Sequence, residues 1–453
     1  MFHDICTCEV SLTNADAVDE WNGVILGILS HGQTAPVHLG KLLELAPDYA
    51  LAYAVKGLSS LMLGRRELVE VTAKANQTAQ ACLRAGSATT RERLWCAALD
   101  AWLRGHPSVA IARMEDALLL NPADTISMKL SHGIRFIIGD AHGMRRSVER
   151  VMPAHDPDHP LRGYALGCLA FGMEETGNYA EAERMGLQGL ETALDDAWGL
   201  HAVTHVYDMT HRTDDGIALI DGNIAAWDHC NNFRFHVWWH KALLHLDQGD
   251  IAQVLSLYDT QIRNEKTDDY RDFSNASSLL MRLELEGVEV GARWDELADL
   301  AEKRSDDGCL VFADLHYMLA LAGDNREDAA AHMMARVARD AQGHDEMALI
   351  MDNPGVAAAK GLAAFGSAQY GTAFDKLRAA RPRFQMMGGS HAQRDVFERV
   401  TIEAGLRAGR LDATETLLRA RTSMRDGAID AFADKRLRMI ADAREIQATF
   451  AAE

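Results

Sequence analysis

A short turn that recurs at regular intervals is the feature of this sequence that most constrains its fold. In four cases the turn begins with glycine and in one with histidine, and a small or apolar residue follows five positions later. The pairs are Gly105 with Ala110, Gly139 with Met144, Gly177 with Ala182, His211 with Gly216, and Gly249 with Val254. Their second members lie 34, 38, 34 and 38 residues apart. A period of this length predicts a repeat array, in which each unit buries its apolar face against its neighbours.

The segments between the turns carry the periodicity of α-helices. Apolar residues recur three and four positions apart, as in the segments 94–101 and 166–173. No proline occurs between Pro160 and Pro354, so long uninterrupted helices are allowed there. Alternation of the strand type is nearly absent. The sequence therefore predicts an all-α protein.

The length of the unit indicates which helical array this is. A helix–turn–helix unit of 34 residues is typical of the tetratricopeptide repeat, and one added helical turn lengthens it to 38. The unit from 91 to 124 fits best, with small residues or proline at Ala98, Gly105, Ala110, Ala117 and Pro122. Weaker copies of the turn are expected at Gly64, Gly323, Gly371 and Gly409.

These observations predict a tetratricopeptide-like α/α superhelix. We expect an N-terminal helical cap over 1–45 and regular helical repeats over 46–305. A less regular helical section over 306–453 is expected to continue or close the superhelix. An irregular helical bundle is the alternative architecture.

Charge and cysteine content limit the partners and the compartment. The chain has 66 acidic and 46 basic residues, which gives a formal charge of −20. Such a surface repels phosphate backbones and anionic lipid, so we expect neither nucleic acid nor a membrane as a partner. Seven widely spaced cysteines suit reduced thiols, and neither a signal peptide nor a long apolar segment is visible. These features predict a cytoplasmic protein.

Two pairs of histidines with the same spacing form a candidate metal site. His201 and His205 are four residues apart and therefore lie on one face of a helix, and His236 and His240 repeat this spacing in the next unit. Asp208 continues the first face. Imidazole and carboxylate groups at these spacings can converge on Zn, Fe, Mn or Ni. The alternative is that these histidines form structural hydrogen bonds.

The repeat alignment predicts the direction in which these residues point. Measured from the turns, Trp198, His201, His205 and Asp208 fall at positions 2, 5, 9 and 12 of their unit. In proteins that this repeat resembles, these positions line the concave groove. The same alignment brings Tyr164, Glu174, Glu175 and His236 to the inner wall. Of Trp238 and Trp239, one is expected to pack between units and the other to face the groove; we assign Trp239 to the ligand.

A second candidate site lies near the C-terminus, where Gly388-Gly389 precedes a predicted helix. Ser390 and Gln393 have the capping-box spacing, which explains both residues structurally. A helix N-terminus with paired glycines also accepts anions. His391, Arg394 and Asp395 would then face a carboxylate or phosphate of the ligand.

Several strings of residues resemble those of the tetratricopeptide repeat protein 38 family. They are 91–93, 166–179, 196–198, 201–206, 236–246 and 388–395, and the similarity extends over roughly 40 to 425. The histidine strings make it specific, although Asp208 stands where that family usually has glutamate. The resemblance implies a tetratricopeptide-like fold and a cytosolic setting, and it implies no particular mechanism.

Two functions fit these features. The first is a small-molecule site, metal-assisted or acid–base, that uses His201, His205, His236 and His240 as ligands or proton carriers. In that case Asp208 is a ligand or orients one, Glu174 or Glu175 is the general base, and Arg394 binds an anionic group. The second is a non-enzymatic adaptor that holds a peptide or protein partner in its groove. A closed cavity would favour the first and an open groove the second.

Overall fold

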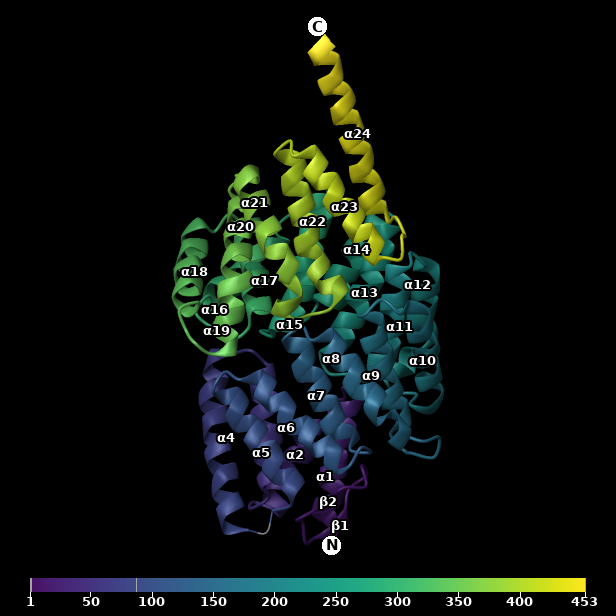
Figure 1. The fold of residues 1–453 in the computed structure, drawn as a ribbon, viewed down its shortest axis with the longest axis vertical. Helices are drawn as coiled ribbons and strands as arrows, with labels where there is room; N and C mark the ends of the chain where they lie inside the picture. Colours follow the sequence, from purple (N-terminus) through teal and green to yellow (C-terminus); the bar gives the residue numbers. More distant parts are fainter. Residues whose placement is uncertain (1, 87, 453) are drawn as a thin grey trace.

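The computed structural model describes residues 2–86 and 88–452, and within these ranges the chain is almost entirely helical (Figure 1). A small antiparallel hairpin pairs β1 (Phe2–His3) with β2 (Glu9–Val10). The α-helices are α1 (Ala15–Leu29), α2 (Ala35–Leu45), α3 (Ala50–Met62), α4 (Arg66–Ala85), α5 (Thr90–Leu103), α6 (Pro107–Leu120), α7 (Thr125–Ile137), α8 (Ala141–Val151), α9 (Arg162–Glu174), α10 (Tyr179–Thr192), α11 (Ala197–Met209), α12 (Thr213–Gly222), α13 (Phe233–Asp247), α14 (Ile251–Leu257), α15 (Tyr270–Leu285), α16 (Arg293–Arg304), α17 (Val311–Gly323), α18 (Glu327–Asp340), α19 (Glu346–Ile350), α20 (Val356–Gly366), α21 (Tyr370–Ala380), α22 (His391–Arg407), α23 (Leu411–Met424) and α24 (Ala431–Ala452). Short helical turns η1 (Met152–Ala154), η2 (Ile224–Ala226), η3 (Tyr258–Ile262), η4 (Met351–Gly355) and η5 (Arg381–Met387) connect some of them.

Consecutive helices pack in pairs, and the predicted turns join them. The first residue of each of the five turns has the left-handed backbone conformation: φ is +83° at Gly105, +71° at Gly139, +80° at Gly177, +58° at His211 and +77° at Gly249. Glycine adopts this conformation without steric cost, which explains why it recurs there. The predicted tetratricopeptide-like all-α superhelix is confirmed.

The turn predictions at Gly323 and Gly371 were wrong in detail. Gly64 and Gly409 have positive φ as expected, but in the other two units Asn325 and Ala368 have it instead. Gly323 ends α17, where an added Cβ would meet the ring of Trp294 at 2.6 Å. This glycine is therefore required by close packing and not by the turn.

The first superhelical turn closes on itself after about 200 residues, since the loop after α1 contacts the loop before α13. The amide of Asn231 donates to the carbonyl of His31 (2.8 Å), and His229 Nε2 lies 3.0 Å from the carbonyl oxygen of Ser30. A β-bridge between Gly32 and Cys230 joins the same loops.

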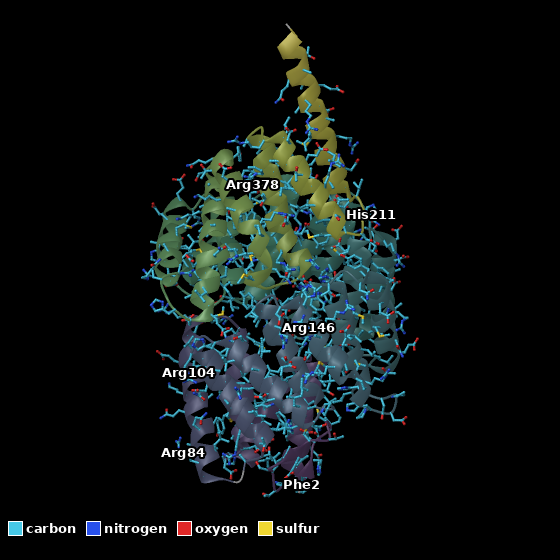
Figure 2. All side chains as sticks on the ribbon, viewed as in Figure 1. Phe2, Arg84, Arg104, Arg146, His211 and Arg378 are labelled. Atoms are coloured by element: carbon cyan, nitrogen blue, oxygen red, sulfur yellow. The ribbon has the colours of Figure 1, made fainter. Side chains whose placement is uncertain are left out.

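The rest of the chain forms a second turn that stacks on one edge of the first. In Figure 1 the helices α17–α23 lie above α3–α9, and α24 projects away from both turns. The contacts between the two turns are made by helix ends and by the loops beside them, and Figure 2 shows the side chains in the same view. They include Arg66 with Asp306, Glu67 with Arg304, Ser108 with Glu346, Glu175 with His391, and Asp208 with Arg425. Later in the chain, α24 returns to contact Asp247 through Ala431 and Glu286 through Lys435.

The apolar core is divided among several clusters that follow one another along the array, as expected for stacked units. The division of the chain at 45 and 305 stays a prediction. No helix within the described ranges is long and apolar enough to cross a bilayer.

Candidate functional site

Four buried histidines meet between α11 and α13, and we call them the histidine quartet: His201, His205, His236 and His240. Their Nε2 atoms form a chain, with 2.9 Å between His205 and His201, 3.1 Å between His201 and His236, and 3.2 Å between His236 and His240. Two nitrogens bound to one tetrahedral zinc at the usual bond length lie about 3.3 Å apart. The spacing of the quartet is therefore close to that of a metal ligand set.

Hydrogen bonding among the histidines alone does not explain this arrangement. A neutral imidazole Nε2 either donates one hydrogen or offers one lone pair, so His201 Nε2 cannot satisfy both of its neighbours. His236 Nδ1 lies 2.8 Å from Asn275 Oδ1, which only accepts, so the hydrogen of His236 is on Nδ1 and its Nε2 presents a lone pair. The quartet can therefore hold a metal ion.

The electrostatics of the quartet favour neutral imidazoles. Burial lowers the pKa of His201 and of His240 well below the ordinary value, and the neighbouring histidines lower it further. Burial likewise lowers the pKa of His236 to about 3. His205 differs: burial lowers its pKa, but the carboxylates of Glu174, Glu175 and Asp208 together outweigh burial and raise it. Three of the four side chains are thus neutral, with lone pairs available, at neutral pH.

Glu174, at the end of α9, is the acid nearest to the quartet. Its Oε2 lies 3.5 Å from His205 Nδ1, and the side chain is fully buried. Within the described residues neither of its carboxylate oxygens has a hydrogen-bond partner at ordinary geometry. A buried carboxylate next to the outer nitrogen of a ligating histidine fixes the tautomer of the ring and raises its basicity.

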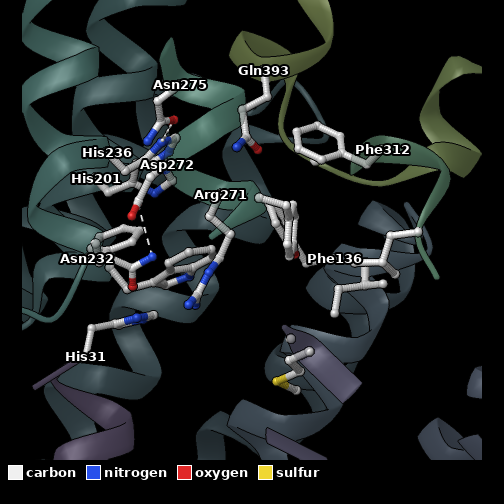
Figure 3. A pocket seen from close by; sticks show the side chains of 18 of the residues that line it. His31, Phe136, His201, Asn232, His236, Arg271, Asp272, Asn275, Phe312 and Gln393 are labelled. Atoms are coloured by element: carbon white, nitrogen blue, oxygen red, sulfur yellow. Dashed lines mark hydrogen bonds between the residues drawn. The ribbon is translucent and has the colours of Figure 1, made fainter. Parts of the chain in front are cut away.

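One end of a cavity of about 190 Å³ is formed by His201 and His236 (Figure 3). Both superhelical turns contribute to its wall. Besides these two histidines, the lining includes the charged, polar and aromatic side chains of His31, Lys129, His132, Phe136, Trp198, Asn232, Phe233, Tyr270, Arg271, Asp272, Asn275, Phe312 and Gln393. In Figure 3 the histidines lie at one side and Phe136 and Phe312 at the other. The cavity is therefore closed in part by α17 and α22 of the C-terminal section.

Not every residue predicted from the sequence reaches the cavity or the quartet. Trp198 does, and its Nε1 donates to His132 Nε2 (3.2 Å). Asp208 instead pairs with Arg425 at the contact between the two turns (3.1 Å). Tyr164 donates to Asp195 (2.7 Å) and is outside the lining set.

Trp239 lies behind the quartet and not in the cavity wall. Its ring stacks on that of His236 with 5.1 Å between centroids and 16° between planes. Trp239 is fully buried, whereas Trp238 is only partly buried and packs edge-on against Trp227. The ligand role predicted for Trp239 is therefore replaced by a supporting one, because the ring orients His236.

The anion site predicted at the start of α22 is occupied by a carboxylate of the chain itself. The capping box of Ser390 and Gln393 is present. Glu175 accepts from the amide of His391 (2.6 Å) and from Arg394 (3.0 Å). Burial raises its pKa, but the charges of His391 and Arg394 outweigh burial, with smaller contributions from His205 and the amide, and lower it. The predicted acceptor of a ligand anion thus joins the two superhelical turns.

Asp395 also serves the internal structure, since it pairs with Arg399 (2.7 Å) and Arg421 (2.6 Å). The positive charges lower its pKa well below the ordinary range despite burial. Neither Asp395 nor Arg394 lines the cavity within the described residues.

Sequence reasoning missed Lys129 and Asn275, which line the cavity. A signal for Lys129 was present, because it lies 15 residues before Met144 just as His201 lies 15 residues before Gly216. The two residues therefore occupy equivalent positions of their units. Asn275 offered no comparable signal, since α15 follows a linker that breaks the repeat spacing.

No protein-family model matches this chain. Among solved structures, the chain is similar to one in the structure of Naa15/Naa10 bound to HypK-THB, with 12% identity, 89% of this chain and 68% of that chain covered, and a TM-score of 0.25. It is also similar to yeast Tom70, with 11% identity, 95% and 88% covered, and a TM-score of 0.36.

Proposed function

We propose that the histidine quartet binds a divalent transition metal, Zn, Fe, Mn or Ni, at one end of a small-molecule cavity. The observation that carries this proposal is the convergence of four buried Nε2 atoms whose hydrogen-bonding capacity cannot be satisfied among themselves. Imidazole nitrogen suits these metals, and no thiolate is part of the set.

The arrangement supports a metal-assisted or acid–base reaction on a small molecule. A bound divalent metal polarises a carbonyl or lowers the pKa of bound water. His201 and His236 line the cavity, so a metal bound to them would face it. Glu174 contacts His205 on the side away from the other histidines and orients its ring. In this proposal Glu174 acts through His205, and Glu175 is a structural residue and not a general base.

The alternative is a non-enzymatic adaptor that binds a peptide in the groove. A partly closed cavity of about 190 Å³, to which both superhelical turns contribute, supports the small-molecule function better.

We also propose membership of the tetratricopeptide repeat protein 38 family, on the histidine strings described above. A cytoplasmic location agrees with seven cysteines that are all unpaired.

Elemental analysis of protein purified without chelators tests the metal proposal. We expect about one equivalent of a transition metal per chain, because four converging imidazole nitrogens form one preorganised set. Removal of the metal by a chelator should lower the melting temperature, and reloading should restore it, since an ion that binds only the folded state stabilises that state. Protein that holds no metal after incubation with each of the four ions would refute the proposal.

A Glu174→Gln variant tests the supporting role of the carboxylate. The substitution keeps the shape of the side chain and removes its charge, so His205 becomes a weaker ligand. Loss of such an outer partner typically costs about 10–100-fold in metal affinity. Competition with a chromophoric chelator measures the change, with Glu183→Gln, a partly exposed acid on α10, as the control. Equal affinities for the two variants would contradict this role.

A further inference from the structure

Lys129 is a buried cation on the cavity wall that forms no ion pair with a carboxylate among the described residues. Its side chain, on α7, is only 9% exposed, and it lines the cavity. Within the described residues no carboxylate lies within 4.0 Å of its ammonium nitrogen, which instead lies 4.7 Å from the centre of the Trp198 ring. A cation–π contact offsets only part of the cost of burying a charge. Burial raises the pKa of the Asp196 carboxyl to about 7 and the charge of Lys129 lowers it, but no ion pair engages the ammonium, which remains available to an anion in the cavity.

The other charged groups of the cavity are already engaged. Arg271 forms two hydrogen bonds with Asp269, at 2.9 and 2.6 Å. Asp272 accepts from Asn232 (3.1 Å) and Thr267 (2.5 Å). Lys129 is thus the charged group of the lining that has no such partner among the described residues.

The remaining wall suits a flat apolar body. Phe136, Phe233, Tyr270 and Phe312 line the cavity together with Trp198, and His31 stacks on Phe233 with 4.6 Å between ring centroids. An apolar cavity of about 150 Å³ in another protein holds benzene. A volume of about 190 Å³ therefore accommodates one aromatic ring with one small substituent.

Trp198 connects the lysine to the quartet. Its ring centre lies 5.1 Å from that of His201, while the Lys129 ammonium lies 4.7 Å from the same indole. A ligand that pairs with Lys129 and lies along the indole therefore extends toward His201 and His236. Its far end reaches the side of the cavity where the metal is proposed.

We propose that the cavity binds a small aromatic or similarly flat carboxylate, whose anionic group pairs with Lys129 and whose body packs along Trp198 toward the quartet. This inference deepens the function proposed above, which supplies the metal at the far end. The pairing with Lys129 itself depends only on the cavity.

Calorimetric titration with benzoate, benzamide and benzylammonium tests this inference. The three probes have similar size and differ in charge. We expect benzoate to bind at least about 10-fold more tightly than benzamide and benzylammonium not to bind, because an ion pair formed away from water is strong. The Lys129→Met variant keeps the length of the side chain and should lose the preference for benzoate. Lys74→Met, an exposed lysine on α4, is the matched control.

Each outcome separates this inference from the metal proposal. Metal content measured on the Lys129→Met variant should equal that of the unaltered protein, because Lys129 is not a ligand. If the protein holds no metal but still binds benzoate in a Lys129-dependent way, the carboxylate inference stands and the metal proposal fails. Equal binding of benzoate and benzamide, no effect of Lys129→Met, or no binding of benzoate at about 10 mM would overturn the inference.

Discussion

A His201→Ala/His240→Ala double variant is expected to lose the metal of the quartet. The substitution removes one ligand from α11 and one from α13, so neither helix retains a pair. Since loss of an outer partner alone costs about 10–100-fold, removal of two ligating nitrogens should lower the affinity by well over 100-fold. Elemental analysis after gel filtration, with a chelator titration on reloaded protein, measures the loss.

His211→Ala/His332→Ala provides the control for this variant, because both histidines are exposed. Circular dichroism and the melting temperature of the metal-free proteins show whether the double variant folds. If the void left by the alanines unfolds the protein, the His201→Gln/His240→Gln variant, which fills more of the space, allows the same measurement on a folded protein. Metal content equal to that of the unaltered protein in a folded double variant would refute the metal site.

The second large effect is expected for Glu175→Ala. This substitution leaves the Arg394 guanidinium buried without its carboxylate partner and the amide of His391 without its acceptor. Breaking a buried ion pair by removing one partner typically costs about 3–5 kcal/mol of unfolding free energy. Because the pair joins the two superhelical turns, limited proteolysis should also cut the C-terminal section faster.

Glu181→Ala is the matched control for this prediction. Glu181 pairs with Arg184 on α10, but these side chains are 37% and 61% exposed, and such pairs contribute about 0–1 kcal/mol. Urea denaturation of both variants measures the difference. A Glu175→Ala variant as stable as the control would show that the contact does not hold the turns together.

The repeat and the quartet could be predicted from the sequence because both depend on local spacing. Left-handed turns fix where the two helices of each pair meet, and a spacing of four residues places two imidazoles on one face. Equal turns in neighbouring units then bring the two pairs together. The prediction extended as far as the contact between one unit and the next.

The second superhelical turn could not be predicted in this way. The pairing of Glu175 with Arg394 joins residues 219 positions apart, and no period connects them. The sequence therefore indicated an anion site at α22 without indicating that the chain supplies the anion. Asp208 was misplaced for the same reason, because its partner Arg425 is 217 positions away.

The quartet and the cavity form at different times while the chain is being synthesised. The quartet is complete as soon as α13 has left the ribosome, since its ligands come from two neighbouring helix pairs. The cavity needs Phe312 and Gln393, so it closes only after some 150 further residues have been made and have packed on the first turn. An emerging chain therefore exposes an assembled set of imidazoles to the cell's metal pool before any small molecule can be enclosed beside them.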